Sequence, residues 1–481
     1  MVSMMLNDNE RPPFDHILVK IADYVHDYKV TSSEALTTAH YCLLDAFGCA
    51  ILALHEPECQ RHIGPLVPGA TFAQGVRIPG TGYELEPVHA AFNIGTLVRW
   101  LDYNDTWLAA EWGHPSDNLG AILACADYVA RQQRSAGYDE FTVHHLLVAM
   151  VKAYEIQGIM ALGNSFNNVG IDHVILVKLA STAVATWLLG GDKQATINAL
   201  SNVWLDGGAL RTYRHAPNTG WRKSWAAGDA TSRAVRHALM AIAGEMGYPS
   251  ALTVPRWGFY DVVMKAQPFK LTNTLASYVM ENILFKVSFP AEFHAQTAVE
   301  CALQLHKKVV NRLEKIEHID LKTQSAAMRI INKTGPLHNH ADRDHSLQYA
   351  VAIGLIFGEL QGLHYSDEIA ADPRIDVLRD KMAVTEDKRY TLDYHDPYKR
   401  SIGNSVTVHF NDGTVESEAV EYPLGHRRRR AEAYPLLIEK FNTNLRVHFE
   451  DARVDGLMNT MLDQELLWRM PVSDFMALWA D

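Results

Sequence analysis

The sequence predicts a mainly α-helical protein in which a smaller α/β domain is inserted into a large all-helical domain. Three observations support this fold class. Apolar residues recur at helical spacing through most of the first 270 residues, strand-like patterns follow after about residue 275, and a helical pattern returns over 434–479. We expect a helical domain over 1–275, a lid-like α+β domain over 276–421, and a C-terminal return to the helical domain over 422–481.

The helical part carries recognisable start signals. Thr31 and Glu34 have the spacing of a capping box, and Pro87 stands where the first turn of a helix favours proline. Further helices are expected over 119–131, 141–162, 173–189 and 226–246. Several of these segments are rich in alanine and poor in charge, which indicates helices that are buried on nearly every side.

The inserted part combines a helix with strands. We expect a helix over 291–313 and a strand over 315–323, where β-branched residues are frequent. Val406, Val408 and Phe410 alternate with polar residues, the Asn-Asp-Gly-Thr sequence at 411–414 is a turn signal, and 415–420 continues as a second strand. This pattern predicts a β-hairpin.

The charge balance argues against a nucleic-acid partner. The 481 residues include 44 Lys and Arg against 56 Asp and Glu, which gives a net charge of −12. A protein that follows a long polyanion needs a basic surface, and this composition does not favour one. If the ligand is anionic, its cationic partners must be gathered locally.

The cysteines indicate a reduced protein without a metal cluster. Their number is odd and none forms a C-x-x-C pair, which disfavours disulfides, structural zinc and iron–sulfur clusters. We therefore expect neither a metal nor another cofactor. The N-terminal segment lacks the features of a signal or presequence, and we find no uninterrupted apolar stretch of about 18 residues, so we expect no membrane partner and a cytoplasmic location. The five cysteines are Cys42, Cys49, Cys59, Cys125 and Cys301.

Common catalytic motifs are missing from the sequence. The Gly-Thr-Gly sequence at 80–82 lacks the third glycine of a dinucleotide-binding loop, and there is no P-loop, no H-E-x-x-H and no G-x-S-x-G. These absences disfavour nucleotide-dependent enzymes, zinc proteases and α/β-hydrolases. Acid–base chemistry without a cofactor stays open.

The densest group of reactive side chains lies at 101–118, between two segments that we expect to be buried helices. It contains Asp102, Thr106 and His114 among other polar residues. One interpretation is structural: the first helix ends here, and Ser116 or Asp117 caps the next. The other is an active-site loop on a rigid scaffold, because so many polar groups are costly to bury without a purpose.

The second interpretation is favoured by a resemblance that extends from about residue 12 to 475. The segment Trp-Leu-Ala-Ala-Glu-Trp-Gly-His-Pro-Ser-Asp-Asn-Leu-Gly at 107–120 resembles the signature of the MmgE/PrpD family, and in particular its 2-methylcitrate dehydratase branch. The resemblance continues at 170–174, 211–219, 222–233, 284–294, 341–345 and 422–430. It implies a helical domain built from both ends of the chain, with the α/β domain inserted, which is the MmgE/PrpD fold.

The resemblance also implies a reaction, the dehydration of 2-methylcitrate to 2-methyl-cis-aconitate in propionate breakdown, without an iron–sulfur cluster. Such a dehydration needs a base for a proton on carbon, an acid for the leaving hydroxide, and cations for a tricarboxylate. Imidazoles suit the first two roles, and Lys or Arg suits the third. The expected partner is a small tricarboxylate, and relatives imply a homodimer.

The family motifs match particular residues of this sequence. We expect His114 and His173 to form the acid–base pair, in an order that the sequence leaves open. Asp102 would orient or polarise a histidine or the leaving hydroxyl, and Thr106 would bind a substrate carboxylate. The expected anion-binding groups are Lys223 and Lys286, either of which could instead act as base, with Arg211, Arg214 and His215 as a second cluster. We expect this site in the cleft between the domains.

Alternatives remain at this stage. The protein could be another carboxylate lyase of the family, such as a cis-aconitate decarboxylase, or a non-catalytic metabolite-binding protein with the same fold. Among single residues, His173 could be a structural core histidine, and Arg214 could only pair with Asp229 or Glu245. The arginines at 427–430 could form a solvated face or a dimer contact.

Overall fold

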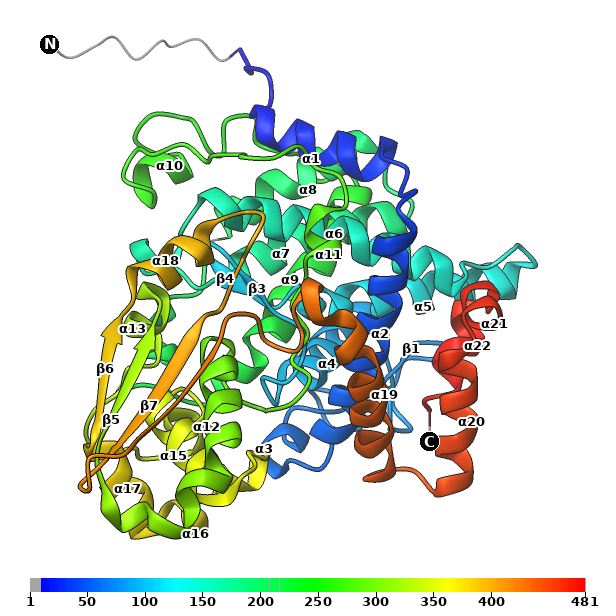
Figure 1. Ribbon diagram of the computed structural model, residues 1–481. Coiled ribbons are helices and arrows are strands. Elements are labelled where there is room, and N and C mark those ends of the chain that lie inside the picture. The colour runs from blue at the N-terminus through cyan, green and yellow to red at the C-terminus, as the bar shows by residue number, and fades with distance from the viewer. Residues whose placement is uncertain (1–9, 207, 216, 481) are drawn as a thin grey trace, which may run out of the picture.

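The computed structural model describes residues 10–206, 208–215 and 217–480, and it contains a large helical body and a smaller mixed body (Figure 1). The first body contains the helices α1 (His16–Asp27), α2 (Ser33–Ala53), α4 (Pro87–Arg99), α5 (Leu119–Ala136), α6 (Val143–Gly163), α7 (Val174–Leu188), α8 (Lys193–Leu205) and α9 (Arg222–Ile242). The C-terminal helices α19 (Arg430–Arg446), α20 (Asp451–Leu462), α21 (Gln464–Arg469) and α22 (Val472–Ala477) return to it. In Figure 1, α19 lies beside α2, although the two helices come from opposite ends of the chain.

Close helix packing in this body depends on small residues. A Cβ atom on Gly95 of α4 would lie 2.9 Å from the Cα atom of Gly228 in α9, and one on Gly228 would lie 2.4 Å from the carbonyl oxygen of Phe92. Glycine at both positions therefore lets α4 and α9 approach until their backbones touch. Since α4 leads directly into the 101–118 loop, this packing fixes the position of the loop.

The smaller body is built on a four-stranded sheet. Its strands are β5 (Ile316–Thr323), β6 (Met382–Glu386), β7 (Asn404–Phe410) and β8 (Val415–Val420), in the order β6-β5-β7-β8. The β5–β6 pair is parallel and the other two pairs are antiparallel. The helices α12 (Gln296–Val309) and α15 (Leu347–Phe357) contribute apolar residues to the same core as the inner face of the sheet. The predicted hairpin at 406–420 is confirmed, because β7 and β8 pair in the antiparallel direction. The predicted alternation is also present, since every second residue of β7 is buried.

Two separate hydrophobic cores match the two bodies. The larger core combines residues between Ile17 and Val287 with residues between Ala433 and Trp479, so it draws on both ends of the chain. The second core contains only residues between Phe289 and Phe410. The mainly helical fold with a small mixed insertion is thus confirmed. The boundaries at 275 and 421 stay a prediction.

Some predicted element starts were wrong. The helix α2 is capped by Ser32, whose hydroxyl accepts from the backbone N–H of Ala35, and not by Thr31 in a capping box with Glu34. The helix expected at 226–246 begins at Arg222, which places Lys223 in its first turn. The helix expected at 291–313 is shorter, since α12 is flanked by 3-10 turns on both sides.

Among the described residues, the helices α2 and α6 are long and apolar enough to cross a membrane, by length and composition alone. In each helix 83% of the most apolar window is buried inside the fold. We therefore assign both helices to the protein core, where a helix that is apolar on all sides belongs.

The side chain of Lys440 in α19 ties the C-terminal return to the rest of the protein. Its Nζ donates to Asp45 Oδ1 at 2.6 Å, to the carbonyl oxygen of Tyr103 at 2.7 Å and to that of Lys286 at 2.8 Å. Burial alone would lower the pKa of Lys440, but Asp45 outweighs it and raises that pKa above its ordinary value. One buried ammonium thus joins α2, α19, the 101–118 loop and the connection into the smaller body.

We predict that Lys440→Met lowers the free energy of unfolding by about 3–5 kcal/mol, because Asp45 would be left as a buried charge without its partner. Urea unfolding followed by circular dichroism measures this change. Lys307→Met, at an exposed lysine of α12, is the matched control and should leave the unfolding midpoint unchanged. A loss below about 1 kcal/mol in Lys440→Met would contradict the role assigned to this ammonium.

Candidate active site

The loop between α4 and α5 is organised by one buried carboxylate, Asp105. Its Oδ1 accepts from the backbone N–H and the hydroxyl of Ser116 at 3.0 and 2.9 Å, and its Oδ2 accepts from the Tyr154 hydroxyl at 2.5 Å. The short strands β3 (Trp107–Leu108) and β4 (Trp112–Gly113) pair within the loop. Ser116 is therefore a partner of Asp105, and the structure gives neither Ser116 nor Asp117 the capping role of the structural interpretation.

His114 is held by this loop in one orientation. Its Nδ1 lies 2.8 Å from the carbonyl oxygen of Asp105, and its Nε2 lies 3.5 Å from Asp102 Oδ1. Because a carbonyl oxygen only accepts, Nδ1 carries the proton and Nε2 presents a lone pair. Burial, followed by the nearby Arg99 guanidinium, lowers the pKa of His114 well below its usual value. The imidazole is therefore neutral near pH 7.

Asp102 stands at the centre of a group of cations. Burial alone would raise the pKa of its carboxyl, but Arg99 and Lys286 outweigh burial and hold that pKa well below its usual range. Their nitrogen atoms lie 2.9 and 3.0 Å from Asp102 Oδ1. Its backbone φ is +51°, a left-handed conformation that is uncommon outside glycine, although aspartate adopts it more readily than most residues.

His173 directly precedes α7 and faces His114, with ring centres 6.2 Å apart. Its Nδ1 lies 3.4 Å from Asp172 Oδ1, and its Nε2 is buried without a hydrogen-bond partner among the residues that the structure describes. Burial lowers the pKa of His173 well below its usual value, Asp172 opposes that shift, and Arg214 adds to it. An unpaired buried nitrogen beside a cavity is the arrangement expected of a group that binds a ligand.

Arg211 and Arg214 gather around the same aspartate. Arg214 forms a forked hydrogen bond to both oxygens of Asp172, so the pairing with Asp229 or Glu245 considered from the sequence is wrong. The Nη1 atom of Arg211 lies 4.0 Å from Asp172 Oδ2, and its Nε is among the buried atoms without a partner in the described part of the chain. Arg211 therefore has spare hydrogen-bonding capacity toward an anion.

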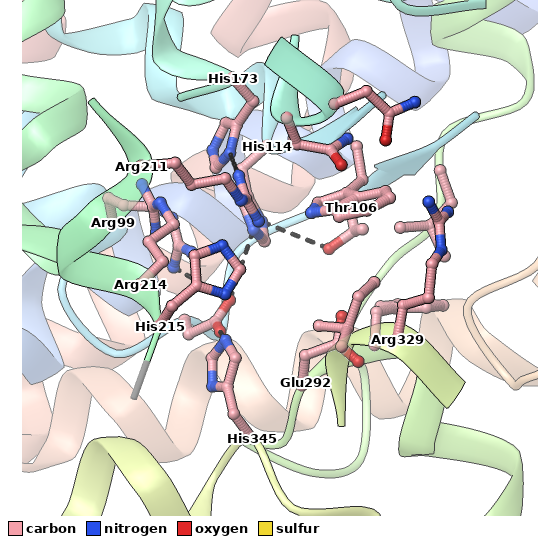
Figure 2. A pocket seen from close by; sticks show the side chains of 18 of the residues that line it. Arg99, Thr106, His114, His173, Arg211, Arg214, His215, Glu292, Arg329 and His345 are labelled. Atoms are coloured by element: carbon pink, nitrogen blue, oxygen red, sulfur yellow. Dashed lines mark hydrogen bonds and ion pairs between the residues drawn. The ribbon is translucent and has the colours of Figure 1, made fainter. Parts of the chain in front are cut away.

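These side chains line a cavity of about 220 Å³ to which both bodies contribute. Seven of the nine predicted site residues are in its lining: Asp102, Thr106, His114, His173, Arg211, Arg214 and His215. Figure 2 shows the labelled histidines and Arg99, Arg211 and Arg214 mainly on one side, and Glu292 and Arg329 on the other. The expectation of a site between the two domains agrees with this position.

The two predicted lysines lie behind the lining and contact the protein's own carboxylates. Lys286 is fully buried and donates to the carbonyl oxygen and to Oδ1 of Asp102. Lys223 donates to both oxygens of Asp344, at 3.0 and 2.7 Å. Burial lowers the pKa of Lys286, although Asp102 opposes that shift. Their binding of substrate carboxylates stays a prediction.

The sequence interpretation missed five charged or ionisable residues of the lining. They are Arg99, Glu292, Arg329, Lys333 and His345. Glu292 and His345 lie in segments that carry the family resemblance, so a signal for them was present. Arg99 ends α4 with no motif of its own, and only the fold brings Arg329 and Lys333 to the cavity.

One cluster at the cavity has the composition of a metal site. Ligand atoms of Asp102, Asp344 and His345 lie within 4.8 Å of one another. Three of the protein's own cations already bind these carboxylates, since Arg99 and Lys286 contact Asp102 and Lys223 contacts Asp344. The charge of the carboxylates is thereby largely balanced, which disfavours a divalent ion. The absence of a metal cofactor stays a prediction.

The arginines at 427–430 are bound within the protein. Arg427 donates to Glu34 at 2.6 Å, Arg428 to the Tyr422 hydroxyl at 2.8 Å, and Arg429 to Glu300 at 3.0 Å. Arg430 is buried and donates to Thr38 at 2.8 Å. Arg427 and Arg428 are exposed, which agrees with the solvated face, whereas Arg430 helps to anchor the C-terminal helices; the dimer contact stays a prediction.

Known proteins resemble this chain along nearly its whole length. Residues 19–272 match the MmgE/PrpD N-terminal domain, and residues 289–464 match the MmgE/PrpD C-terminal domain. A Salmonella typhimurium protein named 2-methylcitrate dehydratase is 55% identical over 475 residues, which cover 98% of each chain. A Yarrowia lipolytica protein named 2-methylcitrate dehydratase, mitochondrial, is 55% identical over 95% of this chain and 89% of its own. An Aspergillus oryzae protein named 2-methylcitrate dehydratase-like protein oryR is 46% identical over 98% of this chain and 97% of its own. The chain belongs to the MmgE/PrpD family.

Proposed function

We propose that this protein is a 2-methylcitrate dehydratase, a hydro-lyase that eliminates water from 2-methylcitrate to give 2-methyl-cis-aconitate. The observation that carries the proposal is the cavity, in which two neutral imidazoles stand beside an ionised aspartate and several arginines. The names and the 55% identity of the bacterial and yeast relatives support the same substrate.

The substrate is a trianion, and the cavity can neutralise it. Arg211, Arg214, Arg329 and Lys333 all line the cavity, so cationic side chains are gathered locally in a protein of net charge −12. Guanidinium groups bind carboxylates with two parallel hydrogen bonds, which fixes orientation as well as charge. Thr106 adds a hydroxyl to the lining, within 3.3 Å of His114 Nδ1.

His114 is the base in this proposal. Its Nε2 lone pair would take the proton from the carbon that bears a carboxylate and the methyl group, and its ring would become an imidazolium. Asp102, whose Oδ1 lies 3.5 Å from that nitrogen, would stabilise the new positive charge. The electron pair left on carbon forms the double bond as the hydroxyl group departs from the neighbouring carbon.

His173 is the acid that protonates the departing hydroxyl group. Binding of a trianion beside it would offset the arginines that lower its pKa, so the imidazole would be more readily protonated in the complex than in the free enzyme. The proton that His173 gives and the hydroxyl group together form water, and His114 retains the proton from carbon. Proton exchange with solvent then restores both histidines.

The setting of the reaction belongs to the same proposal. By the family resemblance, we expect this dehydration to be a step of propionate breakdown through the methylcitrate cycle. A cytoplasmic homodimer is the form that we expect, by the same resemblance. The Yarrowia lipolytica relative is named as mitochondrial, so location varies among similar proteins.

The purified protein, without added metal, is predicted to produce an ultraviolet-absorbing alkene from 2-methylcitrate. The conjugated double bond is the source of this signal, and product identity is checked by mass spectrometry. Carbon dioxide release from cis-aconitate without dehydration of 2-methylcitrate would contradict this function and support a decarboxylase. Lack of turnover with all tricarboxylates would favour a binding protein.

We predict that His114→Ala lowers kcat by at least about a hundredfold, the lower range for loss of a general acid or base. His16→Ala, at an exposed histidine of α1, is the control and should keep full activity. Steady-state rates and the melting temperature are measured for both variants. Near-normal turnover in His114→Ala would remove this residue from the mechanism.

The pH profile of kcat/KM should show an acid limb below the usual histidine value. His114 must be unprotonated to act as base, and its pKa is lowered by burial and Arg99. Protonation of His114 should therefore lower the rate constant only below about pH 6.5, while loss of the proton on His173, the proposed acid, lowers the rate constant as pH rises. Ionisation of the substrate is titrated separately and removed from the profile. A half-maximal point above about pH 7 would contradict a neutral His114.

A further inference from the structure

One side of the cavity is apolar, and the chemistry described above does not use it. Four lining residues form this apolar wall: Leu108, Trp112, Phe293 and Ile330. Leu108 and Trp112 are paired across the β3–β4 hairpin of the helical body. Phe293 lies in a 3-10 turn before α12, and Ile330 ends α13 (Ser325–Ile330) of the smaller body. The wall is therefore assembled from both bodies.

The wall is backed by a small separate hydrophobic cluster. Leu108 and Phe293 are 3% and 2% exposed and pack in one cluster with Leu284, Ala326, Tyr394 and Ile402, while Trp112 and Ile330 pack against it. The backbone of Leu284 also pairs with that of Thr106, so the cluster is linked to the catalytic loop. A wall supported in this way keeps its shape. Adding or removing a single methyl group in one of its side chains should therefore alter how a ligand packs against it.

An anion lies beside the Phe293 end of this wall, whereas the Arg211 guanidinium approaches only its Trp112 end, with its central carbon 5.4 Å from the centre of that ring. The arginines 99, 211 and 214 lie away from Glu292 in Figure 2, and Glu292 directly precedes Phe293. Burial alone would raise the pKa of Glu292, but His294 outweighs it and lowers that pKa, so the side chain is an anion. Arg329 is exposed, with its guanidinium carbon 5.8 Å from the centre of the Trp112 ring, at the edge of the wall.

We propose that the apolar wall is the subsite for the methyl group of 2-methylcitrate, and that Ile330 sets the preference for this substrate over citrate. The inference rests on the proposed function. In that reaction the methyl group is attached to the carbon that loses its proton, so it must lie next to the base. Leu108 meets this condition. It lines the same cavity as His114 and is two residues after Thr106, whose hydroxyl lies 3.3 Å from His114 Nδ1.

The test compares kcat/KM for 2-methylcitrate and citrate in variants of Ile330. Ile330 is half-buried, so its replacement endangers folding less than replacement of Leu108 or Phe293. Ile330→Phe fills the subsite and should lower the ratio of the two constants by at least about tenfold, the scale on which an apolar pocket distinguishes one methylene group. Ile330→Ala removes the contact and should lower the ratio by a smaller factor. Leu363→Ala, at a residue 56% exposed in the same body, is the matched control.

Citrate serves as the internal control for folding. Where its turnover is too slow to follow, its inhibition constant against 2-methylcitrate replaces kcat/KM. The subsite is supported if Ile330→Phe still turns over or binds citrate while its kcat/KM ratio of 2-methylcitrate to citrate is reduced. An unchanged ratio in both Ile330 variants, with wild-type turnover of 2-methylcitrate intact, overturns the subsite alone. Absence of wild-type turnover overturns both the proposed function and the inference that rests on it.

Discussion

The buried carboxylate of Asp102 is the interaction on which the site depends. It accepts from Arg99 at the end of α4 and from Lys286 in the connection to the smaller body, and it lies near His114 and, in the smaller body, His345. These partners come from three separate parts of the chain, so the carboxylate holds the two bodies in register. Removing it would leave buried cations without a counter-charge. The same group that fixes the architecture also lies where it can stabilise the positive charge that the proposed base acquires.

The position of the site resolves an apparent conflict between a protein of net charge −12 and a trianionic substrate. Asp172 and Asp102 hold Arg214 and Arg99 in place, and the lining as a whole contains more cationic side chains than carboxylates. A bound tricarboxylate would find guanidinium groups already oriented. The apolar wall gives the substrate a direction, because its carboxylates favour the guanidinium groups and its methyl group favours the apolar side chains.

Much of this arrangement could be predicted from the sequence, and the failures have physical reasons. Helical spacing and alternation identify the bodies, since burial imposes those periods, and the 101–118 loop is conspicuous because polar groups between buried helices are costly. The partners of Lys223 and Lys286 were not predictable, because Asp344 and Asp102 are brought to them by the fold. Arg329 and Lys333 were missed for the same reason. The N-cap at Ser32 was missed by one residue, since neighbouring threonine and serine offer the same hydroxyl.

The most direct test of the account is a crystal structure of the His173→Ala variant with 2-methylcitrate bound. The account predicts that the carbon bearing the methyl group lies about 3–3.5 Å from His114 Nε2, the separation of reacting atoms in a productive complex. It also predicts that the methyl group touches Leu108, Phe293 or Ile330, and that the carboxylates face the arginines. A complex in which that carbon lies nearest to Lys223, Lys286 or Glu292, and away from His114, would contradict the central claim.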